Sequence, residues 1–305
     1  MEKSTEMTYR QLGNSALNVS QISLGCMSLK PEEANFDTVI GAAIDNGINF
    51  FDTADLYDHG LNEVCLGKAL KEIRKQVIIA TKVGNKWKPD GTGFSWNPDK
   101  KYIIGAVEES LKRLQTDYID LYQLHGGTIE DDIDDTIDAF ETLKQQGKIR
   151  YYGISSIRPN VIREYVKRSS IISVMMQYSL LDRRPEESCL QLLKEHNIGV
   201  LARGSVASGL LAGKEAKPYI GYNETEVKKA AEAIEMIIMA GSNMAATAIA
   251  YVLQNSAIST AVVGIRNMQQ LSESLQVLHK KNQFSNDEMQ VLNSSVLIDH
   301  YKQHR

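Results

Sequence analysis

Four residues could together deliver a proton to a carbonyl group. Asp52, Lys82 and His125 each stand at the end of an apolar segment, and Tyr57 follows Asp52 by five positions. A phenol with a pKa near 10 is a weak acid at neutral pH, but a neighbouring ammonium group stabilises the phenolate and lowers that pKa. A carboxylate can hold the lysine charged, and a histidine can hydrogen-bond to the oxygen that receives the proton. This set of residue types predicts a general acid directed at a carbonyl.

Each of these residues also has an ordinary structural interpretation. Asp52 could cap a turn, Tyr57 could pack in a loop, and His125 could be a hydrogen-bonded core histidine. Lys82 stands out because lysines are rarely buried without a partner. A lysine at a strand end can also form a Schiff base with a carbonyl substrate. Two enzyme classes therefore remain open at this point, one with Tyr57 as a general acid and one with Lys82 as a nucleophile.

Short apolar segments alternate with longer amphipathic ones along the chain. The amphipathic segments predict helices, such as 36–47 and 138–148, each ended by a glycine. The apolar segments predict parallel strands covered on both faces. These segments are 22–25, 48–53, 77–82, 119–125, 149–156, 172–179, 200–205 and 260–265.

Eight such strand–helix units predict an α/β fold, a (β/α)8 TIM barrel. A doubly wound sheet is the alternative. The segments MTYRQL and LNVSQI, separated by GNSA, predict an N-terminal β-hairpin. No linker or change of composition divides the chain, so residues 1–305 are expected to form a single domain. Because barrel enzymes carry their chemistry at the carboxyl ends of the strands, the four residues above should meet at one mouth.

The composition limits which kinds of partner and which cellular location can be expected for this chain. The net charge is −4 with both signs interspersed, which argues against nucleic acid as a partner. No apolar run approaches the ~20 residues needed to span a bilayer, and the N-terminus lacks the apolar core of a secretion signal. Three separated cysteines are typical of a reducing cytoplasm and exclude a cysteine-only zinc site, so no metal is expected. The oligomeric state is left open.

Four motifs, FDTADLY (51–57), ATK (80–82), YIDLYQLH (118–125) and GKIRYYGISS (147–156), resemble those of the aldo-keto reductases. The resemblance covers nearly the whole chain. It implies that Tyr57 is the general acid, that Lys82 tunes it, that Asp52 positions Lys82, and that His125 orients the substrate carbonyl. Some members of this family act chiefly as cofactor-sensing regulatory subunits, which adds a non-enzymatic alternative.

The resemblance also implies a nicotinamide cofactor, which would supply the hydride. Neither GxGxxG nor GxxxxGK[ST] occurs in the chain; in this family the dinucleotide lies across the barrel mouth instead. Arg266 stands where the family places a cation for the adenosine 2′-phosphate, so NADPH is expected rather than NADH. The positions that match the family's cofactor contacts are Gly25, Ser155, Gln177, Arg203, Gly204, Ser205, Gly209, Leu211, Gly264, Arg266, Gln270 and Glu273.

Several positions depart from the family pattern. Arg203 replaces an aromatic residue that usually stacks on the nicotinamide, and Ser156, Val263 and Ser274 replace an asparagine, a proline and an asparagine. The segment after 209–214 is short. These departures bear on cofactor affinity more than on the type of reaction.

An apolar and aromatic set is expected to line the substrate pocket: Met27, Leu56, Trp87 and Trp96. The chain after residue 280 is expected to be mostly helical. A small aldehyde or ketone fits such a pocket better than a bulky steroid, and nothing in the sequence identifies the physiological substrate.

Overall fold

The barrel predicted from the sequence is present. A computed structural model of the chain describes residues 6–31, 35–238, 242–279 and 284–305. The eight barrel strands are β3 (Ile22–Gly25), β4 (Phe50–Asp52), β5 (Ile78–Val83), β8 (Ile119–Leu124), β9 (Ile149–Ser155), β10 (Ser173–Gln177), β11 (Gly199–Arg203) and β12 (Ile258–Gly264). Each overlaps one of the predicted segments. They pair in parallel in chain order, and β12 pairs with β3 to close the barrel, so the doubly wound alternative is wrong.

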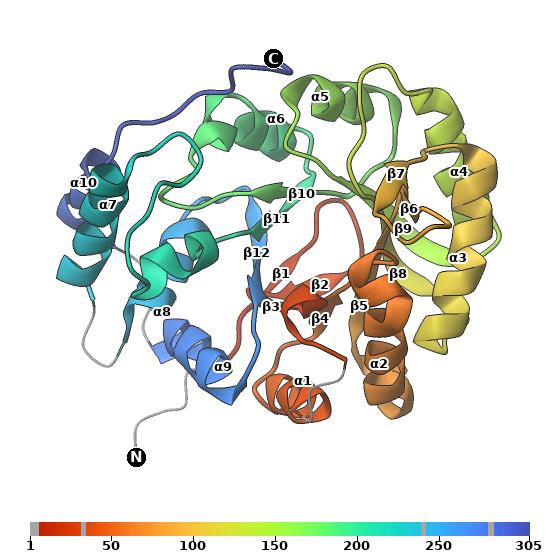
Figure 1. The fold of residues 1–305 in the computed structure, drawn as a ribbon, viewed down its shortest axis with the longest axis horizontal. Helices are drawn as coiled ribbons and strands as arrows, with labels where there is room; N and C mark the ends of the chain where they lie inside the picture. Colours follow the sequence, from red (N-terminus) through yellow and green to blue (C-terminus); the bar gives the residue numbers. More distant parts are fainter. Residues whose placement is uncertain (1–5, 32–34, 239–241, 280–283) are drawn as a thin grey trace.

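Helices surround the barrel on the outside (Figure 1). They are α1 (Phe36–Asp45), α2 (Leu61–Leu70), α3 (Lys100–Leu114), α4 (Ile133–Gln145), α5 (Pro159–Arg168), α6 (Cys189–Glu195), α7 (Glu224–Met236), α8 (Met244–Leu253), α9 (Met268–Leu275) and α10 (Asn286–Ser294).

Helix α4 illustrates why these segments are helical. The Asp132 side chain accepts a hydrogen bond from the Asp135 N–H, which satisfies one of the free donors of the first turn. Phe140 and Leu143 lie on the buried face, as their spacing predicts. Gly147 adopts a φ of 73°, a conformation that favours glycine, and the chain turns there into β9.

An antiparallel hairpin, β1 (Tyr9–Gln11) and β2 (Asn18–Ser20), confirms the prediction for the N-terminus. Figure 1 shows it inside the ring of helices. Leu12, Leu17 and Val19 are buried and pack with the inward-facing side chains of the barrel. The hairpin therefore closes the end of the barrel where the strands begin.

A second hairpin follows β5 and was not predicted. It consists of β6 (Asn85–Trp87) and β7 (Phe94–Trp96) and pairs in antiparallel register. The sequence does contain a signal for it, because Pro89, Asp90 and Gly91 between the two aromatic strands are typical turn residues.

The prediction of a mostly helical tail is wrong. Helix α10 ends at Ser294, and the last eleven residues contain no helix. Val296 and Tyr301 are buried, and the Arg184 guanidinium lies over the Tyr301 ring, 5.2 Å from its centroid. The Tyr301 N–H also donates to Glu187 Oε2 over 3.2 Å. Tertiary contacts, rather than local helix propensity, decide its path.

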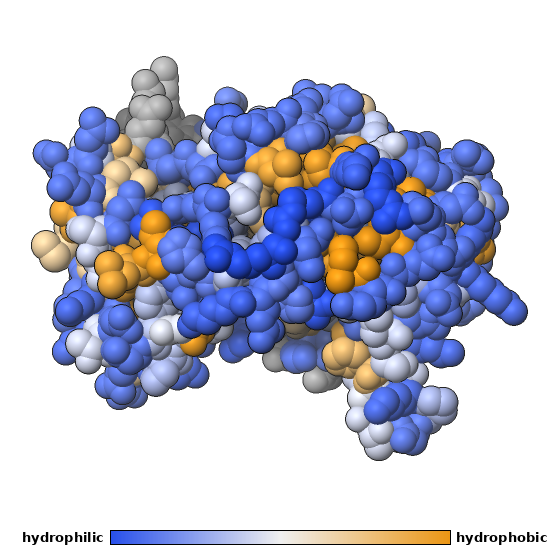
Figure 2. Space-filling model, turned by 90° about the horizontal axis from the view of Figure 1, so that it is seen from above, coloured by the Kyte–Doolittle hydropathy of each residue, from blue (hydrophilic) through white to orange (hydrophobic). Residues whose placement is uncertain are grey.

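No helix among the described residues has the length and apolar character required to cross a bilayer. The face seen in Figure 2 is mainly hydrophilic, with apolar side chains in separate patches.

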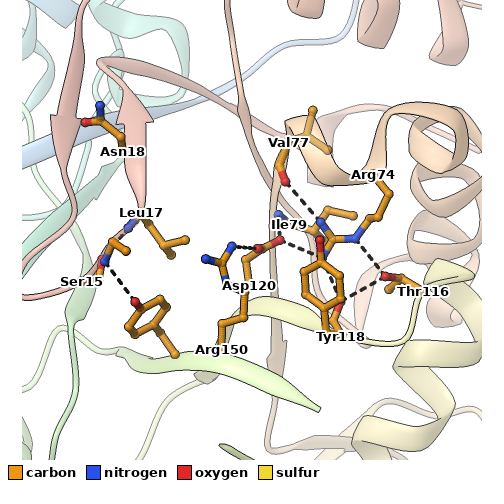
Figure 3. Close-up of polar contacts among 12 residues, drawn as sticks. Ser15, Leu17, Asn18, Arg74, Val77, Ile79, Thr116, Tyr118, Asp120 and Arg150 are labelled. Atoms are coloured by element: carbon orange, nitrogen blue, oxygen red, sulfur yellow. Dashed lines mark hydrogen bonds and ion pairs between the residues drawn. The ribbon is translucent and has the colours of Figure 1, made fainter. Parts of the chain in front are cut away.

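A buried carboxylate ties the strands together at the end of the barrel opposite the predicted site. Asp120 of β8 is 1% exposed and accepts a hydrogen bond from the Ile79 N–H over 3.0 Å. Its Oδ2 lies 2.7 Å from Arg74 Nη2, and its Oδ1 lies 2.9 Å from Arg150 Nη1 (Figure 3). The Arg74 guanidinium also stacks on Tyr118, 4.1 Å from the ring centroid. Asp120 thus links β5, β8 and β9 to the 3-10 segment η3 (Lys71–Gln76).

We expect Asp120→Ala to destabilise the fold by about 3–5 kcal/mol, because it leaves the mostly buried Arg74 without its counter-ion. Arg150→Ala is the matched control. Its side chain is 45% exposed, and solvent screens the pair, so a loss of at most about 1 kcal/mol is expected. Urea unfolding of the three proteins would measure both effects. Equal losses in the two variants would contradict this account.

Candidate active site

The alternation of side chains along the strands turns the predicted residues toward one point. Phe50, Ile78 and Leu121 lie in the apolar cluster inside the barrel. Asp52 lies two residues beyond Phe50 and Lys82 lies four residues beyond Ile78, so both side chains must also face inward. Gly25 pairs with Asp52, so β3 and β4 end at the same level, and Asp52 pairs with Ala80, two residues before Lys82 on β5.

Lys82 is the centre of this cluster. Its ammonium group is 1% exposed and lies 2.5 Å from Asp52 Oδ2 and 2.7 Å from the Thr53 carbonyl oxygen. The same nitrogen donates to Tyr57 Oη over 3.2 Å. The structure therefore brings together the three residues that the sequence predicted to form a proton-donating group.

Burial opposes the charged form of both members of the Lys82–Asp52 pair. It alone would lower the pKa of Lys82, but Asp52 and Tyr57 together outweigh this effect, and the pKa of Lys82 is raised. Burial likewise raises the pKa of Asp52 against the pull of Lys82. We assign an ion pair, because 2.5 Å is even shorter than the about 2.7–2.9 Å usual for a charge-assisted hydrogen bond between nitrogen and a carboxylate.

Tyr57 is held in its protonated form. Burial raises the pKa of its hydroxyl, and Lys82 acts in the expected opposite direction without reversing that shift. The sequence could predict the effect of the lysine but not the larger effect of burial.

His125 lies at the end of β8 beside Tyr57. The two rings meet edge to face with centroids 6.0 Å apart. Burial, with smaller contributions from Lys82 and Arg203, lowers the pKa of His125 to about 3. The imidazole is therefore neutral at physiological pH. Its backbone is anchored to β5, since the His125 N–H donates to the Val83 carbonyl over 2.7 Å.

Gln123 belongs to the same cluster and was not predicted from the sequence. It is fully buried and donates from Nε2 to Asp52 Oδ1 over 3.2 Å. Asp52 thus has one oxygen bound to Lys82 and the other to Gln123. Gln123 is two positions before His125 on β8 and must share its inward face, which is the signal that could have identified it.

Two aromatic rings cover the loop that carries Tyr57. Asp58 and His59 have φ values of 46° and 55°, an uncommon conformation for residues other than glycine. His59 stacks on Trp87 with centroids 3.7 Å apart, and Trp87 Nε1 donates to the Leu56 carbonyl over 3.2 Å. Lys30 Nζ pairs with Asp58 Oδ1 at 2.9 Å.

The residues predicted to contact substrate lie on three different loops. Met27 is 58% exposed after β3, and Leu56 and Trp87 are partly buried next to Tyr57. Trp96 of β7 lies next to Gly84 and Gly126, and its Nε1 donates to the Asp131 carboxylate, in the loop between β8 and α4, at 3.0 Å.

The positions predicted to contact cofactor follow the rim on the other side of the mouth. Gly25 and Gly264 are paired at the ends of β3 and β12, and Gln177 and Arg203 are paired at the ends of β10 and β11. Ser155 ends β9. These five positions lie at the ends of neighbouring strands around the barrel, and their contact with a cofactor stays a prediction.

The segment after β11 has an unusual backbone. Gly204 and Gly209 have φ values of 75° and 94°, and Ala207 and Ser208 also have positive φ. Such runs of turn conformation expose backbone N–H groups that can receive an anion. Ser205 is buried, and its hydroxyl forms no hydrogen bond with a described residue. Leu211 is buried in the 3-10 segment η5 (Ala207–Ala212) and supports this loop.

The segment before α9 presents Arg266 to solvent. Its guanidinium makes no ion pair with a described residue. Gln270 Oε1 accepts from the Arg266 N–H over 3.0 Å, so it holds the backbone of this turn. Glu273 lies one turn later and accepts from Gln269. The conformation of the turn leaves the Arg266 side chain available to a ligand.

Eight parallel strands with one polar cluster at their carboxyl ends define an enzyme of the (β/α)8-barrel class. Residues 21–296 match the model of the Aldo/keto reductase family. The chain therefore belongs to the aldo-keto reductase family and is an oxidoreductase.

Individual relatives agree with this assignment. The chain is 48% identical to the uncharacterized oxidoreductase YqkF of Bacillus subtilis, over 98% of this chain and all of that protein. The holo form of aldo-keto reductase AKR11C1 from Bacillus halodurans superposes with a TM-score of 0.92 at 47% identity, covering 98% of this chain and all of that one. The Schizosaccharomyces pombe protein named aldo-keto reductase yakc [NADP(+)] is 35% identical over 68% of this chain and 64% of its own length.

The low pKa of His125 generates a prediction about acid stability. Between pH 6.5 and about 3 the unfolded chain binds a proton here and the folded chain does not, so stability falls as the pH is lowered. From pH 6.5 to 4.5, we expect His125→Asn to lose roughly 2 kcal/mol less stability than the wild type.

Urea unfolding at the two pH values would measure this difference. The same substitution at the exposed His196 controls for the general loss of an imidazole. Identical pH dependence in wild type and His125→Asn would show that folding leaves the protonation of His125 unchanged.

Proposed function

We propose that this protein reduces the carbonyl of an aldehyde or ketone to an alcohol, with NADPH as the hydride donor and Tyr57 as the proton donor. The observation that carries the proposal is the contact of one buried ammonium group, that of Lys82, with both Asp52 and Tyr57. The family's motifs and the NADP(+) in the name of one relative support the choice of cofactor.

Residues of the chain can supply the proton that carbonyl reduction requires. When bound, NADPH supplies a hydride to the carbonyl carbon. As the carbonyl π bond breaks, Tyr57 Oη transfers its proton to the oxygen, and the Lys82 ammonium stabilises the phenolate that remains. Neutral His125 donates a hydrogen bond to the same oxygen, which orients the carbonyl. Solvent then returns a proton to Tyr57.

Several features of the rim fit NADPH. The hydroxyl of Ser205 is buried and unpartnered, the backbone of η5 has the positive φ values of an anion-binding turn, and Arg266 is exposed. We assign Ser155 and Gln177 to the nicotinamide end, the segment from Arg203 to Leu211 to the pyrophosphate, and Arg266, Gln270 and Glu273 to the adenosine end. Gly25 and Gly264 would leave room beside the cofactor.

The Schiff-base alternative is weaker. A lysine nucleophile must be neutral, and Asp52 holds Lys82 in its charged form. Borohydride trapping with a carbonyl compound should therefore give no adduct on Lys82. The regulatory alternative requires cofactor binding without turnover, which the tests below would detect.

A small carbonyl compound is the proposed substrate, bounded by Met27, Leu56 and Trp87. We place the protein in the cytoplasm, because its three cysteines are odd in number and far apart in the sequence, as is typical of a reducing compartment. Neither nucleic acid nor a membrane is proposed as a partner.

Tyr57→Phe removes the proton donor and keeps the ring. We expect NADPH oxidation with a panel of aldehydes and ketones to fall by about 10²–10⁴-fold, with NADPH affinity preserved. The loss of absorbance at 340 nm measures turnover. Turnover retained in the variant would refute Tyr57 as the acid, and tight NADPH binding by an inactive wild type would favour the regulatory alternative.

Arg266→Ala removes the proposed partner of the 2′-phosphate. We expect the Kd for NADPH to rise by roughly ten- to a hundredfold, as for the loss of a charged hydrogen bond, while the Kd for NADH stays nearly constant. Fluorescence titration with the two cofactors measures both constants. An equal loss for NADPH and NADH would remove the assignment of Arg266.

A further inference from the structure

A chain of three polar side chains crosses the rim at the end of β10. Arg203 Nη1 donates to Gln177 Oε1 over 2.9 Å, and Gln177 Nε2 donates to Tyr219 Oη over 3.0 Å. Gln177 and Arg203 are neighbours on paired strands. Tyr219 comes from the segment after η5 and is 42 residues away from Gln177 in the sequence.

The two partners fix the orientation of the Gln177 amide. A guanidinium can only donate hydrogen bonds, so the oxygen of the amide must face Arg203. The amide nitrogen then faces Tyr219. Burial raises the pKa of the Tyr219 hydroxyl, which stays protonated and accepts this bond through its oxygen. One N–H and one lone pair of the amide remain, and a primary carboxamide offers the complementary donor and acceptor.

The turn that carries Tyr219 is strained. The backbones of Tyr219 and Tyr222 exchange two hydrogen bonds, of 3.0 and 2.9 Å, across a tight turn. Ile220 within it has a φ of 52°, which is rare for a β-branched residue. The Ile220 side chain is 44% exposed, so its packing does not force this conformation. Strain of this kind persists where surrounding contacts require a particular geometry.

The other tyrosine of the turn anchors it elsewhere. Tyr222 Oη donates to the Leu297 carbonyl over 2.7 Å and accepts from the Asp299 N–H over 3.2 Å. The turn is therefore held against the C-terminal segment by Tyr222, while Tyr219 reaches the barrel rim.

We propose that Tyr219 is a positioning residue of the cofactor site, which together with Arg203 holds the Gln177 amide ready for the carboxamide of the nicotinamide ring. This inference rests on the proposed function, because it takes Gln177 as the contact at the nicotinamide end. The inference also assigns a role to Arg203, which stands where the family motif usually has an aromatic residue. Arg203 orients the amide oxygen of Gln177.

Tyr219→Phe tests the inference, because it removes only the hydroxyl. We expect the Kd values for NADP+ and for NAD+ to rise by the same factor, about three- to tenfold, as for the loss of one neutral hydrogen bond. The Kd for 2′-phospho-ADP-ribose, which lacks the nicotinamide ring, should not change. A general displacement of the loop would weaken all three ligands, so the fragment separates positioning from structural damage.

Tyr222→Phe is the matched control, with the same chemical change in the same turn. It should leave the ratio of the NADP+ and NAD+ Kd values to the Kd of the fragment unchanged, because the Tyr222 hydroxyl bonds the C-terminal segment and not Gln177. Unchanged NADP+ affinity in Tyr219→Phe, or an equal loss for the fragment, would overturn the role of Tyr219 and leave the proposed function intact. If the wild type bound neither NADP+ nor NAD+, both the inference and the proposed function would be overturned.

Discussion

The buried ammonium group of Lys82 is the constraint around which the barrel mouth is organised. A charge removed from water is tolerated only where partners replace its hydration. Asp52, the Thr53 carbonyl and Tyr57 supply them, and all three come from β4 and the loop that follows it. The strands β4 and β5 must therefore pair in the correct register before the charge of Lys82 has its partners. The same ion pair thus links the folding of the barrel mouth to the chemistry of the site.

The two ends of the barrel use polar groups differently. At the end where the strands begin, Asp120 meets backbone and arginine partners, and the N-terminal hairpin seals the interior with apolar side chains. At the other end, polar groups at the rim retain unused hydrogen-bonding capacity, as Ser205 and His125 do. The polar contacts that stabilise the fold lie at the end where the strands begin, and the groups free to bind a ligand lie at the end where the strands finish. This is the division expected of a (β/α)8 barrel.

Loops that vary around this shared framework supply the features particular to this chain. The hairpin of β6 and β7 places Trp87 against His59, next to the loop that carries Tyr57. The short segment after η5 sends Tyr219 to Gln177, where Arg203 meets it from the strand end. Arg203 stands where the family motif usually has an aromatic residue. In this chain Arg203 forms a polar arrangement with Gln177 and Tyr219.

The sequence by itself determined the eight strands, the closed barrel and the meeting of Asp52, Tyr57, Lys82 and His125. Apolar runs mark strands covered on both faces, and the carboxyl ends of parallel strands must lie at one mouth. Only the tertiary structure decided the contact of Tyr219 with Gln177, because Tyr219 lies in a loop whose path no periodic pattern in the sequence fixes. It also decided the path of the C-terminal tail and the net shift in the pKa of Tyr57. Both depend on burial, which is created by the packing of distant segments and is not encoded in any local pattern.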